Sequence, residues 1–172
     1  MRNPNNLFSR FIRDLPPGEV AWIGLRPQRK QPMTSVIEVK ALYNQGLEGD
    51  HRSMSASPSN RQVTIISEEY LVQIAHYLGQ PSISPELVRR NLVVKNINLA
   101  ALRYQQFRIG ESIFEATASC PPCAKMELAL GPGGVAAMLG HGGICAKVVK
   151  EGRISVGDSV QIYHLQPDLF AD

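Results

Sequence analysis

The stretch QFRIGESIFEATAS, residues 106–119, decides the fold class because it is the longest of several β-type segments in the chain. These segments are rich in valine, isoleucine and aromatic residues, and turn residues separate them. Working outward from 106–119, the other β-type segments are 92–97, 61–67, 35–43 and 19–25 on the N-terminal side, and 144–152 and 158–165 on the C-terminal side. This is enough strand for a β-barrel.

Helical patterns are fewer and shorter. Residues 67–79 predict a helix that begins after Ser67 with two acidic residues and ends at Gly79. Further short helices are expected over 84–91 and 134–139, and residues 124–130 favour only a weak one. The fold class expected is therefore mainly β (α+β), a β-barrel with a few short peripheral helices. It would form a single domain over 19–166, between a flexible N-terminal segment (1–18) and a C-terminal tail (167–172).

Composition limits the function classes. Hydrophobic residues make up 44% and charged residues 19% of the 172-residue chain, which is ordinary for a globular protein. Apolar runs such as Val20–Leu25 are far too short to span a membrane, and the N-terminal stretch has no signal-peptide core, so we expect a cytoplasmic protein. The net charge of +3 comes without a basic stripe interleaved with aromatic residues. We therefore expect a small-molecule substrate and neither nucleic acid nor membrane as a partner.

The segment that follows the long β-type stretch, ASCPPCAKM, places Cys120 and Cys123 on either side of two prolines. The chain has three cysteines, an odd number, and this argues against a disulfide framework. Four interpretations are open: a thioredoxin-like redox pair, thiols buried as small hydrophobes, a thiolate that ligates a soft metal in a larger cofactor, and a zinc site. The zinc alternative would be a zinc-stabilised binding module that uses Cys120, Cys123, His141 and Cys145.

A second stretch with chemical potential is GLEGDHRS, residues 46–53. Its glycines allow a tight turn, after which Asp50, His51 and Arg52 present a carboxylate, an imidazole and a guanidinium in succession. More cations follow at Arg61 and in the Arg89–Asn91 step. These side chains are candidates for binding an anion, although each is equally compatible with a solvated surface.

Five stretches of the chain together resemble the MOSC family, which forms the C-terminal domain of molybdenum cofactor sulfurases and also small standalone bacterial proteins. They are GLEGDH (46–51), RQVTIISEE (61–69), ISPELVRRNLVV (83–94), SCPPCAKM (119–126) and GGICAKVVKEGRISVGDSV (142–160). The resemblance implies a MOSC-type β-barrel. It also implies a site for the molybdenum cofactor (molybdopterin), an anionic pterin dithiolene that carries molybdenum.

The resemblance also implies roles for individual residues. Cys123 would be the metal ligand and catalytic thiol, projecting into the barrel mouth, with Cys120 as a supporting or resolving thiol and Cys145 as a rival position. His51 would be catalytic, either as an orienting partner or as a proton donor. The residues expected to bind the cofactor are Asp50, Arg61, Arg90 and Asn91.

The family implies two chemistries. One is reduction of N-hydroxylated compounds, which would need an external electron donor. The other is a sulfur carrier or transferase acting on the cofactor, for which a cofactor-delivery protein is the expected partner. The chain has no region that resembles the pyridoxal-phosphate desulfurase domain of the full sulfurases, so we expect that it does not itself mobilise sulfur from cysteine.

Overall fold

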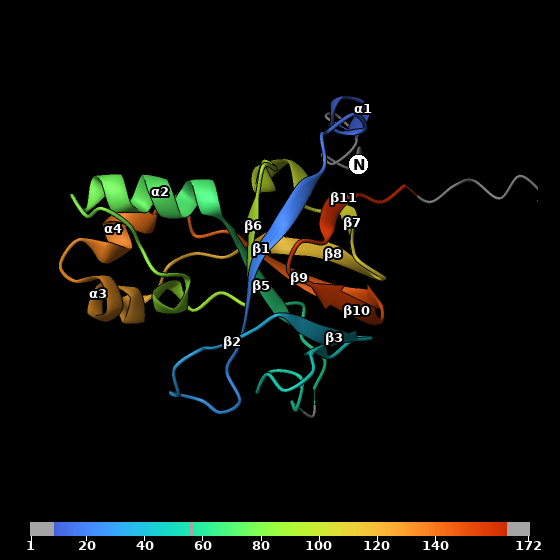
Figure 1. Cartoon of the computed structure of the whole chain (residues 1–172), viewed down its shortest axis with the longest axis horizontal. Coiled ribbons are helices and arrows are strands. Elements are labelled where there is room, and N and C mark those ends of the chain that lie inside the picture. The colour runs from blue at the N-terminus through green and yellow to red at the C-terminus, as the bar shows by residue number, and fades with distance from the viewer. Residues whose placement is uncertain (1–8, 56, 165–172) are drawn as a thin grey trace, which may run out of the picture.

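A computed structural model describes residues 9–55 and 57–164 of the chain (Figure 1). Within these residues the strands are β1 (Gly18–Leu25), β2 (Thr34–Val36), β3 (Glu38–Leu42), β4 (Gly46–Leu47), β5 (Val63–Ser67), β6 (Leu92–Lys95), β7 (Gln106–Ile109), β8 (Ser112–Ser119), β9 (Ile144–Lys150), β10 (Gly152–Ser155) and β11 (Ser159–Ile162). The helices are α1 (Ser9–Ile12), α2 (Glu68–Tyr77), α3 (Ala124–Leu130) and α4 (Gly134–Met138), with 3₁₀ turns η2 (Pro85–Val88) and η3 (Leu99–Leu102).

The large sheet closes into a barrel. Its strand order is β11-β7-β8-β9-β5-β6-β1-β2, and β1 pairs with β11 as well as with β6, so the strands from β11 to β1 form a closed ring. β5 and β6 are parallel, whereas the other neighbours in this sheet are antiparallel. A small sheet, β10-β3-β4, lies beside the barrel. The predicted β-barrel with few short helices is therefore confirmed.

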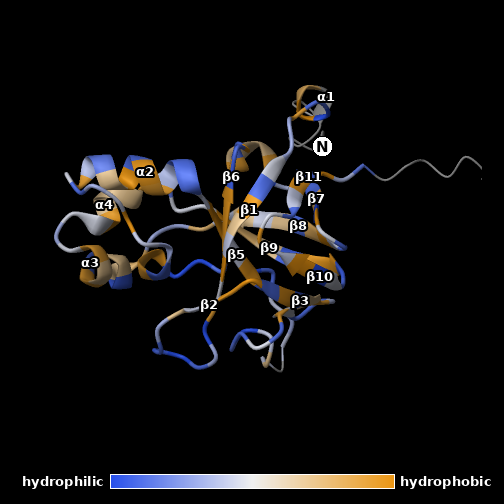
Figure 2. Cartoon of the chain, viewed as in Figure 1, coloured by the Kyte–Doolittle hydropathy of each residue, from blue (hydrophilic) through white to orange (hydrophobic). Residues whose placement is uncertain are grey.

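Two hydrophobic cores hold the fold together. The first fills the barrel, where the rings of Phe107 on β7 and Phe114 on β8 stack with centroids 5.7 Å apart and both side chains are fully buried. The second lies between the barrel wall and helices α2, α3 and α4, and it includes Ile66 of β5, Val93 of β6 and Met126 of α3. Figure 1 shows these three helices gathered at one side of the barrel, and Figure 2 shows that hydrophobic and hydrophilic residues alternate along them. All five residues of β5 are buried, because this strand lies between the two cores.

The helices follow their local sequence signals. Ser67 caps α2 because its hydroxyl oxygen accepts a hydrogen bond from the Tyr70 N–H at 3.1 Å. The predicted helix over 84–91 is only the 3₁₀ turn η2, which ends because Arg89 adopts a left-handed conformation with φ of 58°. Residues 124–130, which favour only a weak helix, form the complete helix α3 immediately after Cys123.

The predicted strand over 35–43 is divided in the structure. β2 extends the large sheet by pairing with β1, whereas β3 pairs with β10 and β4. The break falls at Ile37, whose side chain is 82% exposed. The C-terminal tail (167–172) and the first eight residues of the N-terminal segment lie outside the described residues. No helix in the described part of the chain is long and apolar enough to cross a membrane.

Candidate functional site

The turn after β4 is held by the buried carboxylate of Asp50. Its oxygens accept hydrogen bonds from the backbone N–H groups of Arg26 and Arg52, both at 3.0 Å. The Nδ2 of Asn91 donates a third hydrogen bond to this carboxylate, also at 3.0 Å. Asp50 is only 2% exposed, so the charge of a buried carboxylate is compensated by donors. The effect is to hold the loop after β1 against the turn after β4.

Asn91 uses all its hydrogen-bonding groups inside the protein. Besides Asp50, its Nδ2 donates to the Gly24 carbonyl at 3.2 Å, and its Oδ1 accepts from the N–H and the hydroxyl of Thr64 at 3.1 and 3.0 Å. The structure thus brings together Asp50 and Asn91, two residues expected to bind a cofactor. Their direct bond and the saturated amide point to a supporting role, in which they position the arginine-bearing loops.

His51 lies half-buried beside the same loop. Its Nδ1 is 3.2 Å from the Arg26 carbonyl and 3.3 Å from a carboxylate oxygen of Asp50, and its Nε2 is 3.4 Å from an Arg26 guanidinium nitrogen. A neutral ring with its proton on Nδ1 satisfies these contacts. Burial lowers the pKa of His51, the Arg26 cation lowers it further, and Asp50 partly opposes both. The neutral imidazole is therefore favoured at neutral pH.

Guanidinium groups are concentrated around this turn. Arg29, Arg52 and Arg61 line a pocket of about 440 Å³ together with His51 and polar loop residues. Arg26 lies next to it, and its pKa is lowered first by burial and then by the nearby cations Arg89, Arg52 and Arg29, against the opposing effect of Asp50. The Nε atom of Arg26 is buried and has no hydrogen-bond partner among the described residues. Several cations close together, one of which has an unpaired N–H donor, form an environment that favours anion binding.

Arg90 has a different task from the other arginines. Its side chain is 6% exposed, and it donates to three carbonyl oxygens: from Nε to Gly142 at 2.8 Å, from Nη1 to Val88 at 2.9 Å and from Nη2 to Cys120 at 3.3 Å. The guanidinium fork that was expected to hold an anion is thus occupied by the backbone. Arg90 fixes the segment that carries Cys120.

The three cysteines occupy different environments. Cys120 is half-buried, Cys123 is exposed and Cys145 is buried. A hydrogen bond from the Cys145 thiol lowers the pKa of Cys120 to about 6, an effect that burial opposes and the cations Arg90, Arg52 and Arg61 reinforce. The same contact, together with burial, raises the pKa of Cys145. Cys120 is therefore the more readily ionised thiol of this pair, and Cys145 the more weakly acidic one.

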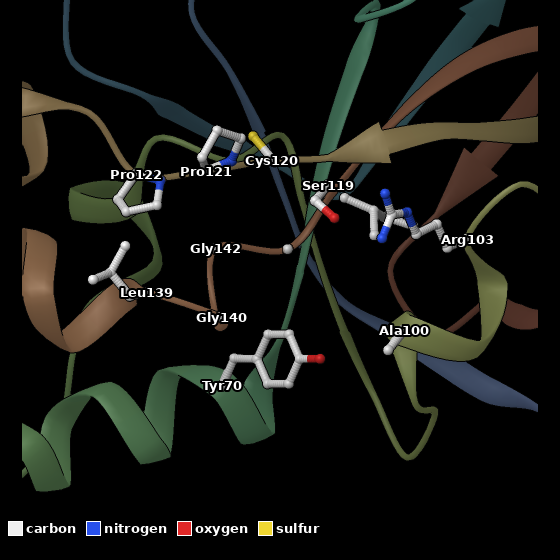
Figure 3. A pocket seen from close by; sticks show the side chains of 12 residues that line it. Tyr70, Ala100, Arg103, Ser119, Cys120, Pro121, Pro122, Leu139, Gly140 and Gly142 are labelled. Carbon is white, nitrogen blue, oxygen red and sulfur yellow. The ribbon is translucent and has the colours of Figure 1, made fainter.

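Cys120 also borders a second pocket, of about 280 Å³, whose wall includes Tyr70, Arg103, Ser119 and Pro121 (Figure 3). In the close view, the Cys120 sulfur points away from the Tyr70 ring. The sulfur is instead within electrostatic reach of Arg52 and Arg61, which line the basic pocket. Cys120 thus lines the pocket beside Tyr70, while its thiol is influenced by two cations that line the basic pocket.

A family model for the MOSC domain matches residues 48–161, about two thirds of the chain. The chain belongs to the MOSC domain family. This family is associated with the molybdenum cofactor. The match covers the Asp50 turn, Arg90 and all three cysteines, but not the loop that carries Arg26.

Solved structures support the MOSC fold. The YuaD protein from Bacillus subtilis superposes with a TM-score of 0.73 at 19% identity, over 88% of this chain and 98% of that chain. YiiM from Escherichia coli superposes with a TM-score of 0.65 at 18% identity, over 87% of this chain and 72% of that chain. YiiM from Geobacillus stearothermophilus superposes with a TM-score of 0.68 at 16% identity, over 87% of this chain and 76% of that chain. At such identities the likeness concerns the fold alone. A comparison with curated proteins gave no significant match.

The zinc alternative for this MOSC domain is contradicted by the geometry. Among residues 9–55 and 57–164, no group of three or more His, Cys, Asp or Glu side chains is placed to hold a metal ion. The ring of His141 instead packs edge-on against Tyr70 and Tyr77, with centroids 5.2 and 5.8 Å apart. Its Nδ1 is 3.0 Å from the Leu139 carbonyl. The expected four-residue site, Cys120, Cys123, His141 and Cys145, is therefore not formed.

Cys123 is the most open of the three thiols. It is the N-cap residue of α3, with φ of −128° and ψ of 171°, and it forms no side-chain capping hydrogen bond. Within the described residues it lines neither the basic pocket nor the pocket beside Tyr70. The structure thus places Arg61 beside the turn that carries Asp50 and His51. It places Arg90 against the Cys120 carbonyl. Cys123 lies on the exposed segment that follows.

The sequence analysis missed Arg26 and Arg29. Both lie in the loop between β1 and β2, and the structure places them at the basic pocket through the hydrogen bond from the Arg26 N–H to Asp50. The available signal was the basic run RPQRK at 26–30, immediately after an apolar strand. A run of this kind is usually a solvated loop, and only the contact with Asp50 gives it a place in the site.

The thiolate character of Cys120 can be measured by alkylation. The rate at which iodoacetamide modifies Cys120 should rise with pH through an inflection near 6, because the thiolate is the nucleophile. Peptide mass spectrometry over a series of buffers resolves Cys120 from Cys123. In Cys145→Ala the inflection should move to higher pH because the S–H donor is lost. A wild-type inflection at the ordinary cysteine value of ~8.5 would contradict the assignment.

Proposed function

We propose that this MOSC domain binds the molybdenum cofactor in the arginine-lined pocket. The observation that carries the proposal is the cluster of Arg26, Arg29, Arg52 and Arg61 around the Asp50 turn, with the buried and unpartnered Nε of Arg26. A phosphate-bearing pterin is polyanionic, and guanidinium forks bind phosphate oxygens through paired hydrogen bonds. The donors of this pocket fit such a group.

The proposed metal ligand is Cys123. A thiol that ligates the metal of a bulky cofactor must be open to it, and Cys123 is the exposed one of the three. Molybdenum suits a soft thiolate ligand. Cys120 is less suited, because it lies half-buried against Cys145 under the carbonyl-bound Arg90.

When bound, the cofactor would supply two-electron redox chemistry, and the proposed reaction is reduction of an N-hydroxylated compound with electrons from an external donor. His51 is proposed to position substrate or cofactor. Its lowered pKa keeps the ring largely unprotonated, which favours a hydrogen-bonding role over that of a general acid. Asp50 and Asn91 would hold the turn that presents His51 and Arg52.

Sulfur transfer is the second candidate, and the Cys120 thiolate favours it. A thiol with its pKa lowered to about 6 is a nucleophile at neutral pH. It can attack the outer sulfur of a donor persulfide, break the donor S–S bond, become a persulfide itself and release the donor as a thiol. The two chemistries are separated by assay. The cofactor-loaded protein should reduce an N-hydroxylated amidine with a chemical reductant, whereas a sulfur carrier should give a persulfide mass increment on cysteine and no such turnover.

Molybdenum and pterin content after expression in a host that makes the cofactor tests the binding proposal. Wild-type protein should carry both, and Cys123→Ser and Arg61→Gln should each retain at least about tenfold less, equivalent to about 1.4 kcal/mol of binding free energy. Arg108→Gln is the matched control, because Arg108 on β7 is also exposed but stacks over Tyr163, the residue after β11, and does not line the pocket.

Two outcomes would contradict the proposal in different ways. Wild-type protein free of molybdenum and pterin would remove the cofactor as the ligand. Loss of molybdenum in Cys120→Ser but not in Cys123→Ser would keep the cofactor and transfer the ligand role to Cys120.

A further inference from the structure

The thiol that faces Cys120 is not its neighbour in the CPPC sequence. Ala118 pairs with Cys145 and Ser119 with Ile144 across β8 and β9, and the Cys120 N–H donates to the Gly143 carbonyl at 2.8 Å. Residues two apart on a strand share a face of the sheet. Cys120 and Cys145 therefore project from the same face as diagonal neighbours, and their thiols are in hydrogen-bond contact.

Cys123 is directed elsewhere. Pro121 and Pro122 separate it from Cys120, and each proline fixes its own φ and disfavours a helical turn in the residue before it. Cys123 then begins helix α3, with its side chain exposed. The two prolines thus carry the chain away from β8, and the hydrogen-bond partner of the Cys120 thiol is Cys145.

The two thiols of this pair differ in access. Cys145 is 1% exposed and lies within the barrel wall. Cys120 is half-buried just past the end of β8, and its sulfur points away from Tyr70 and lies near the cations Arg52 and Arg61. A small uncharged oxidant can therefore reach Cys120, whereas Cys145 is protected. The cations Arg90, Arg52 and Arg61 stabilise negative charge on the accessible sulfur.

We propose that Cys120 and Cys145 form a peroxide-sensitive thiol pair, in which Cys120 is oxidised first and Cys145 resolves it into an intramolecular disulfide. The Cys120 thiolate attacks one oxygen of hydrogen peroxide and breaks the O–O bond, which gives a sulfenic acid and hydroxide. The Cys145 sulfur then attacks the Cys120 sulfur, forms the S–S bond and displaces the sulfenic oxygen, which leaves as water with the Cys145 proton. The two thiols supply the two electrons that reduce the peroxide, and the hydroxide takes up a proton from solvent.

The disulfide would change the candidate site without requiring that the cofactor be bound. It would remove the thiolate charge that faces Arg52, Arg61 and Arg90. It would also tie the end of β8, from which the Cys123 segment departs, to β9. Oxidation is therefore expected to alter how the basic pocket binds anions, so that the redox state of the protein regulates this site.

Mass spectrometry of the peroxide-treated protein tests the pair. After digestion without reductant, the predominant new species should be the Cys120 and Cys145 peptides joined with loss of two hydrogens, reversible by dithiothreitol. In Cys145→Ala the disulfide should be lost, and a dimedone-type probe should label Cys120 as sulfenic acid. Cys123→Ser is the matched control, and it should form the same disulfide as wild type.

A different disulfide would overturn the proposal. Joining of Cys120 to Cys123, labelling of Cys123 before Cys120, or a disulfide between two chains would each show that the cross-strand contact does not direct the chemistry. Unchanged thiols after peroxide treatment would do the same. Because the wild-type peptide map decides the question alone, the test does not depend on whether Cys145→Ala folds. The pair is also separable from the cofactor proposal, since apo protein suffices.

Discussion

Replacing Asn91 with alanine should lower the free energy of unfolding by about 3–6 kcal/mol, because it leaves several buried groups without a partner. The amide of Asn91 donates to Asp50 and to the Gly24 carbonyl, and it accepts from Thr64. Each group left buried and unpaired costs about 1–3 kcal/mol, and one of them is a carboxylate. Denaturant unfolding followed by circular dichroism measures the change, which should appear in the midpoint with an unchanged m value.

Asn98→Ala is the matched control for this prediction. Asn98 is also an asparagine that bonds a backbone N–H, but it is an exposed cap that accepts only from Ala100, at 3.1 Å. Loss of such a cap costs about 1 kcal/mol. If Asn91→Ala cost no more than Asn98→Ala, the buried network between Asp50, Thr64 and Asn91 would not hold the barrel as described.

The elements that could be predicted from sequence are those whose signals are local. Helix α2 carries its own cap at Ser67 and an apolar face that includes Leu71 and Ile74, so neither its start nor its buried side depends on distant residues. β10 was missed as a strand of its own, because it is short and its pairing partner, β3, lies far away in sequence. The local sequence of a strand does not indicate a pairing partner that is distant in the chain.

The sequence indicated candidate residues for the site, but it did not indicate the contacts that these residues make. Asp50 and Asn91 were expected to bind a cofactor. They instead bond each other, because the pairing of β5 with β6 and of β6 with β1 brings these two residues, 41 positions apart in the chain, into contact. Arg90 has the donors expected of an anion binder, but the sequence does not show that three carbonyls lie within reach. The charge and type of each residue can be read from a sequence, whereas the group that its side chain faces cannot.

The cysteines illustrate the same limit. Spacing along the chain suggests that Cys120 and Cys123 act together. Strand register instead sets Cys120 against Cys145, and the intervening prolines lead Cys123 to the start of α3. The backbone N–H of Arg26 donates a hydrogen bond to Asp50, and this contact places Arg26 beside the basic pocket. The identity of its side chain therefore did not predict this position.

Gly143→Ala should be the other severe substitution, with an expected loss of about 3–5 kcal/mol of unfolding free energy or failure to accumulate as soluble protein. Gly143 has φ of +89°, and a Cβ built there would overlap the Ile65 carbonyl oxygen and lie 2.9 Å from its carbon. Ile65 belongs to β5 in the middle of the barrel wall, so its backbone cannot move aside without breaking the pairing of β5 with β6 and β9.

Gly140→Ala separates backbone strain from this overlap. Gly140 has a similar φ, +78°, but nothing lies within 4 Å of its added Cβ. It should therefore lose only the cost of a left-handed alanine, about 1–2 kcal/mol. The Gly143 carbonyl also accepts the Cys120 N–H at 2.8 Å, so any folded Gly143→Ala protein should show an altered alkylation rate at Cys120, whereas Gly140→Ala should keep the wild-type rate. Equal stability losses in the two variants would mean that the close approach of Gly143 to β5 does not restrict this position.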